Sequence, residues 1–367
     1  MATPERDTIL QALDAIMDPD LAQGLVTLNM IRDLTVEGDD VSLRLVLMSP
    51  ASPLREVLEE QVRSTLTGLG VSGPNLTVEG EVQPAARPDG AMGQRAPGVK
   101  AVICVGSGKG GVGKSTVASN VAIALSQLGC KVGLLDADIY GPSMPTMLGL
   151  TGARPSATED GKGIEPLERY GLKVMSMGFM MKADDAVIWR GPMLGKALQQ
   201  FIEDVNWGEL DYLILDMPPG TGDVQLSLSQ LLPVAGSVVV TTPQDVAFAD
   251  VRRAIKMFNT THTPILGLVE NMSHFTCGQC GAEHHIFGDG RIAEQAAEEQ
   301  VEVLGRLPLD SVTAVAADQG QPIVVASRDS DISQSYRTLA QNIARKIALK
   351  TASAPRPEFK EFFQMKR

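Results

Sequence analysis

A glycine-rich run in the first half of the chain has the residue types and spacing of a phosphate-binding loop. It reads Gly108-Lys109-Gly110-Gly111-Val112-Gly113-Lys114-Ser115-Thr116. The run follows an apolar strand-like stretch and precedes a helical one, which is the context that the pattern G-x-x-x-x-G-K-[ST] requires. Glycines let backbone N–H groups turn towards a phosphate, while the Lys114 ammonium neutralises the outer phosphates and the Ser115 hydroxyl is suited to hold magnesium.

The loop contains a second lysine, Lys109, directly after its first glycine. A solvated surface lysine is one interpretation of this residue. A cation so near a nucleotide is also suited to reach a phosphate on which negative charge develops, either in its own subunit or in a facing one. The residues alone are consistent with both interpretations.

Cys277 and Cys280 form a C-x-x-C pair in a predicted loop. Two thiolates at this spacing can share one metal, but a closed tetrahedral site needs two further ligands. Three interpretations are open: a zinc site completed by His284 or His285, an iron–sulfur cluster bridged by two copies of the chain, and a redox dithiol. Cys104, in the middle of a predicted strand, is expected to fill the core.

The elements that position these groups follow an alternating order between about Val99 and Lys350. Short apolar runs alternate there with helical stretches, and the runs are KAVICVGS, KVGLLDAD, LKVMSMGF, DYLILDMP, GSVVVTTP and PILGLVEN. Runs that are apolar on both faces indicate strands covered by helices on both sides. The predicted fold class is therefore α/β, with a doubly wound, mainly parallel sheet in a P-loop NTPase domain at residues 99–350.

A small α/β domain is predicted at residues 1–82. It contains two helical stretches, TILQALDAIMD and PLREVLEEQVRSTLTGLG, and two strands, DVSLRLVLMS and NLTVEG. Residues 83–98 are rich in Pro, Gly and Ala and are expected to form a flexible linker. Residues 351–367 are expected to be a tail, because they have no clear periodicity.

The composition limits the classes of protein to which the chain can belong. Its 367 residues carry a net charge of -12 and are 44% hydrophobic, which predicts a folded, acidic protein. Such a charge disfavours binding to nucleic acid or anionic membrane, so neither partner is expected. The chain opens without an apolar secretory segment and has four cysteines, so we expect it in the cytoplasm.

The loop GKGGVGKST resembles the deviant Walker A motif of the ATPase class that includes the partition and septum-site proteins (ParA and MinD), the nitrogenase iron protein and the Mrp/ApbC iron–sulfur cluster carriers. Three further stretches resemble the Mrp/ApbC branch: WRGPM at Trp189–Met193, DYLILDMPPGTGD at Asp211–Asp223 and ENMSHFTCGQCG at Glu270–Gly281. The resemblance extends over nearly the whole predicted ATPase domain. It implies a homodimer that binds ATP and Mg²⁺.

The resemblance also implies roles for single residues at the nucleotide. Lys114, Ser115 and Thr116 would bind the phosphates and magnesium, and Lys109 would cross to the partner's nucleotide. Asp138 matches the carboxylate that orients the attacking water, and Asp216 matches an acid that meets magnesium through water. The resemblance assigns Asp136 no specific role. Its alternative interpretation is an acid that caps a helix or stabilises a turn.

Two further implied roles concern the base and the cargo. Asn271 matches an asparagine that contacts adenine, with a simple turn residue as the alternative. Cys277 and Cys280 would hold a bridging [4Fe-4S] cluster, which the dimer would pass to apo-proteins with help from cluster-assembly factors. Hydrolysis of ATP would be slow without a partner and would be coupled to cluster loading or transfer.

The N-terminal residues resemble a small domain that also occurs alone among iron–sulfur assembly factors. That domain commonly has a cysteine where this chain has Ser52, so partner docking or regulation is a better expectation for it than metal handling. Two rival hypotheses remain for the whole chain. One is a positioning ATPase that acts on membrane or DNA, and the other is a zinc-stabilised nucleotide-binding regulator.

Overall fold

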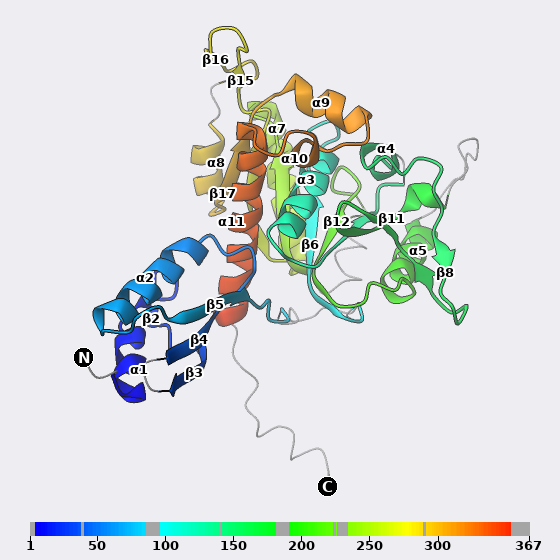
Figure 1. The fold of residues 1–367 in the computed structure, drawn as a ribbon. Coiled ribbons are helices and arrows are strands. Elements are labelled where there is room, and N and C mark those ends of the chain that lie inside the picture. The colour runs from blue at the N-terminus through cyan, green and yellow to red at the C-terminus, as the bar shows by residue number, and fades with distance from the viewer. Residues whose placement is uncertain are drawn as a thin grey trace.

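The computed structural model describes residues 4–37, 40–85, 96–139, 141–180, 191–222, 225, 234–288 and 291–353. An eight-stranded sheet forms its largest part (Figure 1). In spatial order the strands are β10 (Leu167–Arg169), β11 (Leu172–Ser176), β7 (Val132–Asp136), β12 (Leu210–Asp216), β6 (Val99–Gly106), β13 (Val234–Thr241), β14 (Ile265–Asn271) and β17 (Val303–Leu307). All neighbours are parallel except β10, which pairs antiparallel with β11. This confirms the predicted fold class.

Helices cover this sheet on both faces. They are α3 (Lys114–Gln127), α4 (Met144–Met147), α5 (Gly191–Glu203), α7 (Asp245–Thr260), α8 (Ile292–Glu298), α9 (Ser311–Asp318), α10 (Ile323–Ala326), α11 (Asp331–Ser353) and the short 3₁₀ helix η1 (Met177–Phe179). α3 and α11 pack against each other, whereas α7 packs on β13 and β14. The crossovers β6–α3–β7 and β13–α7–β14 move in opposite directions along the sheet, which places α3 and α7 on opposite faces.

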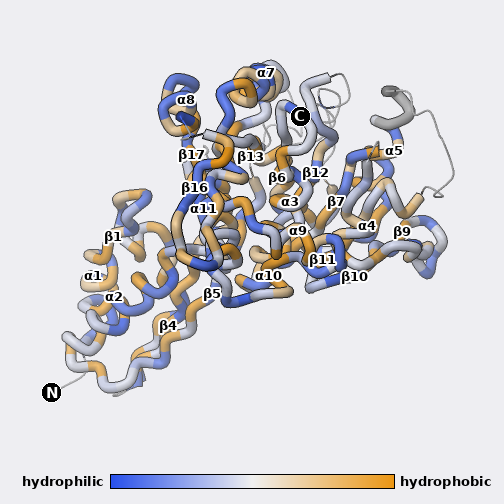
Figure 2. Tube along the Cα trace, turned by 90° about the horizontal axis from the view of Figure 1, so that it is seen from above, coloured by the Kyte–Doolittle hydropathy of each residue, from blue (hydrophilic) through white to orange (hydrophobic). Residues whose placement is uncertain are grey.

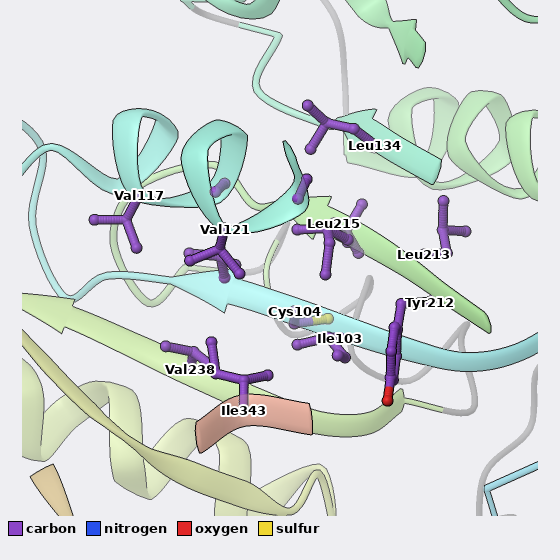
Figure 3. Close-up of a cluster of buried hydrophobic side chains, with 14 of the residues drawn as sticks. Ile103, Cys104, Val117, Val121, Leu134, Tyr212, Leu213, Leu215, Val238 and Ile343 are labelled. Carbon is purple, nitrogen blue, oxygen red and sulfur yellow. The ribbon is translucent and has the colours of Figure 1, made fainter. Parts of the chain in front are cut away.

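The core of the sheet is continuous and apolar. Figure 3 shows Ile103 and Cys104 of β6 beside side chains of β12, α3 and α11. Cys104 is fully buried there, as predicted for a core residue. Apolar segments gather along the central strands in Figure 2. The carboxyl ends of these strands form the edge at which the phosphate loop lies.

The N-terminal unit, residues 6–80, has its own three-stranded sheet and its own core. Its elements are α1 (Arg6–Asp14), the two-residue strands β1 (Met17–Asp18) and β2 (Gln23–Gly24), β3 (Ile31–Glu37), β4 (Asp40–Leu47), α2 (Arg55–Gly68) and β5 (Asn75–Gly80). Both predicted helices and both predicted strands are present, and β3 is an additional strand. The domain limits assigned from the sequence remain a prediction.

Two small hairpins complete the described fold. One consists of β8 (Ser156–Ala157) and β9 (Ile164–Glu165), and the other of β15 (Phe275–Thr276) and β16 (Glu283–His284). The second hairpin stands out from the body of the molecule next to α9 (Figure 1). It carries the cysteine pair. α11 continues to Ser353, slightly beyond the predicted start of the tail, and residues 354–367 lie outside the described residues.

Candidate functional site: a phosphate loop and a cysteine hairpin

The phosphate loop joins the carboxyl end of β6 to the first turn of α3. Gly111 and Gly113 adopt left-handed backbone conformations, with φ of 78° and 80°. A Cβ atom on Gly113 would lie 2.3 Å from Nδ2 of Asn271, so this position also needs glycine for space. Gly110 lies near Pro219, on the segment that follows β12. Residues at or just after the carboxyl ends of β6, β12 and β14 therefore meet at the loop.

Lys114 and Asp216 form the electrostatic centre of this region. Lys114 is the first residue of α3 and is 6% exposed, and its Nζ donates to Oδ1 of the fully buried Asp216. The same Nζ lies 3.2 Å from the Ser115 hydroxyl oxygen. Burial raises the pKa of Asp216, and the Lys114 charge opposes this shift. The structure thus brings together Lys114, Ser115 and Asp216, three of the four residues that the sequence analysis assigned to phosphate or magnesium.

The donor set at this point fits a magnesium ion. Oδ2 of Asp216 is buried and has no hydrogen-bond partner. A buried carboxylate oxygen without a partner is costly unless an ion or water meets it. Ser115 supplies a hydroxyl oxygen from the start of α3, and Mg²⁺ prefers such oxygen ligands together with water and phosphate.

Asp136 holds the loop that follows β7. Its Oδ1 accepts from the Asp138 backbone N–H at 3.1 Å, and its Oδ2 accepts from the Met144 N–H at 3.2 Å and the Ser176 hydroxyl at 3.0 Å. These contacts agree with the alternative interpretation of Asp136 as a turn acid. Burial, together with the charge of neighbouring Asp216, raises the pKa of Asp136 to about 7.

Asp138 lies in this loop on the same edge of the sheet. It is nearly buried, and its Oδ1 accepts from the Gly141 N–H at 3.3 Å. Its role towards an attacking water remains a prediction.

Lys109 turns towards the start of α7. Its Nζ donates to Oε1 of Gln244 at 3.3 Å, and the Thr242 hydroxyl donates to the same oxygen at 3.0 Å. Sequence reasoning missed Gln244. The only available signal was its position directly after the strand GSVVVTTP, where parallel strands bring side chains to the phosphate loop. Within one chain, Lys109 is therefore held by an uncharged partner at the edge of the site.

Asn271 connects the end of β14 to the phosphate loop. Its Nδ2 donates to the carbonyl oxygen of Val112 at 2.8 Å, and the residue is 7% exposed. The predicted site residue thus lies at the loop, although its described contact is with backbone. Its predicted role towards adenine stays a prediction.

The cysteine hairpin begins a few residues after Asn271. Cys277 is half-buried and Cys280 is exposed. The Cys277 N–H donates to the Ala282 carbonyl at 2.9 Å, and the Gly281 N–H donates to the Cys277 carbonyl at 2.8 Å, which closes the turn around both thiols. Hydrogen bonds from the backbone of Cys280 and Gln279 lower the pKa of Cys277, which favours its thiolate.

The nearby histidines do not complete a metal site with the cysteines. His285 Nδ1 lies 3.3 Å from the carbonyl oxygen of Ser273, and the His284 ring packs beside Phe275. Among the described residues, no group of three or more His, Cys, Asp or Glu side chains is arranged to hold a metal ion. One chain therefore presents two thiols on an exposed turn.

Several motif residues fall outside this description. Trp189, Arg190 and Asp223 lie outside the described residues, and the side chains of residues 191–193 are not described either. Ser52, in the N-terminal unit, accepts a hydrogen bond from the Leu54 N–H at 3.3 Å. In the part of the chain that the structure describes, no helix combines the length and apolarity needed to span a bilayer.

Two family models match the chain. The model described as a NUBPL iron-transfer P-loop NTPase matches residues 98–344, and that of an iron-sulfur cluster assembly protein matches residues 6–73. A relative from Synechocystis, named iron-sulfur cluster carrier protein, is 46% identical over 94% of this chain and 98% of its own length. A protein of the same name from Deinococcus radiodurans is also 46% identical, over 95% and 97% of the two chains.

Solved structures share the fold of the sheet unit. A nucleotide-binding protein from Archaeoglobus fulgidus, in complex with ADP, is 39% identical, with a TM-score of 0.56 over 65% of this chain and 92% of its own. The cell division ATPase MinD from Pyrococcus furiosus has a TM-score of 0.50 over 67% of this chain and 98% of its own, at 21% identity. The second similarity concerns the fold alone.

Proposed function

Because the chain belongs to the family of iron-transfer P-loop NTPases, we propose that it is a homodimeric, ATP-hydrolysing carrier of a [4Fe-4S] cluster. The cluster is its cargo, held between two subunits and passed to apo-proteins in the cytoplasm, with cluster-assembly factors as further partners. The observation that carries this proposal is the exposed turn with Cys277 and Cys280. It offers two thiols and, among the described residues, lacks a third protein ligand.

A second copy of the chain supplies what the turn lacks. Two turns that face each other across a two-fold axis bring four thiolates together, and soft thiolates suit an iron–sulfur cluster. The lowered pKa of Cys277 makes the thiolate more available at neutral pH. The exposure of the hairpin lets a recipient protein approach the same cluster.

The nucleotide binds at the phosphate loop. Its phosphates lie against the N-terminus of α3, where Lys114, Ser115, Thr116 and the loop backbone receive them. Lys114 then exchanges its bond to Asp216 for a phosphate oxygen. Ser115 and Asp216 would hold Mg²⁺, which would neutralise charge on the outer phosphates.

Hydrolysis is an in-line attack of water on the γ-phosphate. Asp138 orients this water from the loop after β7. Lys109 leaves Gln244 and reaches the nucleotide of the partner subunit, where its charge stabilises the transition state. The uncharged contact with Gln244 is weak enough to be exchanged for an anion.

One strand links the two sites. β14 delivers Asn271 to the Val112 carbonyl and continues, within a few residues, to the cysteine hairpin. The base of the hairpin is fixed to β17, because the Ser273 N–H donates to the Leu307 carbonyl at 2.9 Å. A change in subunit geometry around the nucleotide therefore changes the distance between the two cysteine turns.

Anaerobic reconstitution of the full chain tests the proposal. The wild type should bind about four iron atoms per dimer, with absorption and Mössbauer spectra of a [4Fe-4S] cluster. Cys280→Ala should abolish this binding and leave ADP affinity unchanged, whereas Cys130→Ala serves as a control for loss of an unrelated thiol. Iron uptake that survives Cys280→Ala, zinc at one per chain, or a chain that stays monomeric with iron present would contradict the proposal.

A further inference from the structure

The N-terminal unit contacts the sheet unit at two places that the proposed function does not use. At the first, the Ser49 hydroxyl lies 3.0 Å from the hydroxyl of Tyr212, on β12, and 4.0 Å from the Cys130 sulfur. All three groups are buried. Pro50 lies beside Gly129, so the N-terminal unit covers the turn that carries Cys130.

At the second place an ion pair joins the two units. Arg345 Nε on α11 donates to Oδ2 of Asp20 at 2.7 Å, and a second guanidinium nitrogen binds the other carboxylate oxygen. The Asp20 side chain is 6% exposed and that of Arg345 is 41% exposed. Two parallel hydrogen bonds to a nearly buried carboxylate make this pair stronger than an ordinary surface ion pair.

The interface between the two units is partly polar. A cavity of about 20 Å³ remains between the units, and its lining includes Asp18, Ser52 and Leu349. Oδ2 of Asp18 is buried and has no hydrogen-bond partner. A polar cavity of this size is large enough for one water molecule, which would meet this oxygen. Ala51 of the N-terminal unit is also buried in the core of the sheet unit, so the interface combines one apolar contact with the Ser49–Tyr212 bond and the Asp20–Arg345 pair. Partly polar interfaces of this kind between units of one chain permit relative motion.

Both contacts lie on elements that lead to the phosphate loop. β12 carries Tyr212 near its start and Asp216 at its end. α11, which carries Arg345, packs along α3, the helix that begins with Lys114. The docked arrangement is the one in which Lys114 is bonded to Asp216. A nucleotide with its Mg²⁺ competes for both of these side chains.

We propose that the N-terminal unit is a nucleotide-responsive regulatory module, docked through Asp20–Arg345 and Ser49–Tyr212 while Lys114 is bonded to Asp216, and released when ATP and Mg²⁺ take these two side chains. The inference rests on the proposed function only in that a nucleotide binds at the phosphate loop. Docking and nucleotide binding are then reciprocally linked, because a ligand that favours one state must bind that state more tightly.

Cys130 provides a native probe of docking in the full chain. Burial raises the pKa of Cys130 to about 12, so the docked thiol is protonated and covered and reacts slowly with N-ethylmaleimide. Separation of the units uncovers it, and its modification rate follows the open fraction. Peptide mass spectrometry measures Cys130 and Cys104 separately. Cys104, fully buried in β6, reports whether the sheet unit stays folded.

The first arm of the experiment breaks the ion pair. Asp20→Asn should raise the Cys130 modification rate about tenfold while Cys104 stays protected. Glu79→Gln is the matched control, since it breaks an ion pair with Arg44 that lies wholly inside the N-terminal unit. An equal rate in Asp20→Asn and the wild type would overturn the docking role of the pair. An equal increase in Glu79→Gln would overturn it as well.

The second arm adds a non-hydrolysable ATP analogue with Mg²⁺ to the wild type. The Cys130 rate should rise at least about fivefold, and the analogue should bind Asp20→Asn more tightly than the wild type by a comparable factor. Calorimetry on the same samples separates two failures. If the analogue binds and the Cys130 rate does not rise, this inference fails and the proposed nucleotide site stands. If the analogue does not bind, both fail.

Discussion

Strand β14 ends between two regions that are built in opposite ways. At the phosphate loop, Lys114, Asp216 and Asn271 are almost completely buried and are bonded to one another or to the loop backbone. At the cysteine hairpin, strands of two residues carry an exposed turn whose thiols make few contacts. The described contacts of Lys114, Asp216 and Asn271 all form within one chain. In the proposed function the hairpin presents half of a site, so its thiols stay open to a second copy of the chain.

Under the proposed function, the same fold holds a nucleotide in a preorganised site and a cargo in an exposed one. Buried polar groups with fixed partners create a preorganised site, but they tolerate little change. An exposed turn tolerates more change and, in the proposed function, gives a recipient protein access to the cargo. Substitutions in the phosphate loop should therefore reduce stability or activity more than comparable substitutions in the hairpin.

The largest effect is expected from Lys114→Ala. The substitution removes the ammonium that receives phosphate and leaves Asp216 buried without its cationic partner. ATP hydrolysis, measured as phosphate release, should fall by about 10²–10³-fold. Lys346→Ala, which breaks a surface ion pair with Glu302, serves as the control and should keep wild-type hydrolysis. Equal rates in Lys114→Ala and the wild type would place the nucleotide elsewhere.

The next largest effect is expected from alanine substitutions at two glycines of the same loop. Gly113→Ala forces a side chain into a left-handed conformation and against the Asn271 amide, which should lower the free energy of unfolding by about 2–4 kcal/mol. Gly111→Ala meets only the conformational cost, because no atom lies within 4 Å of its Cβ position, and should lose about 1–2 kcal/mol. Urea unfolding measures both. Equal losses would show that the contact with Asn271 is unimportant.

The third prediction concerns the pH dependence of the free energy of unfolding, which we attribute to the buried carboxyl group of Asp136. Because the pKa of Asp136 is raised to about 7, the folded chain retains a proton there that the unfolded chain releases near its ordinary pKa of 3.8. The free energy of unfolding therefore decreases as the pH rises between these values, by at most about 1.4 kcal/mol per pH unit. In Asp136→Asn this contribution disappears, and urea unfolding at several pH values should show a flatter slope.

Asp160→Asn is the control for this measurement. Hydrogen bonds from the Thr158 hydroxyl and the Lys162 N–H lower the pKa of the exposed Asp160, so its contribution to stability is lost only at more acidic pH. The slope near neutral pH should stay as in the wild type. An unchanged slope in Asp136→Asn would contradict the assignment of the titrating group.

The comparison also explains what the sequence could predict. Central strands such as KAVICVGS and DYLILDMP are apolar on both faces, so their pattern is strong, and parallel packing alone predicts that Lys114 and Asp216 meet at one edge. The strands that the sequence analysis missed are weaker in pattern. β17 is an edge strand with only partial burial, and β3 contains a register shift near Asp33, whose φ is positive.

The sequence could not predict which distant residues individual side chains would contact. The contact of Lys109 with Gln244, and that of Asp136 with Ser176, depend on how loops from different strands end, which no local pattern records. The cysteine turn was found from its spacing, but the choice among zinc, cluster and dithiol was not. The resemblance to the Mrp/ApbC branch favoured the bridging cluster, and the observed positions of His284 and His285 then argue against a zinc site within one chain.

The smallest effect is expected in the hairpin, from Gly281→Ala. Gly281 has a φ of 71° and open space around its Cβ position, so alanine adds conformational strain without a clash. The strain should loosen the turn around Cys277 and weaken iron retention, measured against a chelator, by about fivefold, or about 1 kcal/mol. Gly278→Ala is the matched control, because Gly278 has similar open space and no positive φ. Similar losses of iron retention in Gly278→Ala and Gly281→Ala would show that the left-handed conformation of Gly281 does not hold the turn.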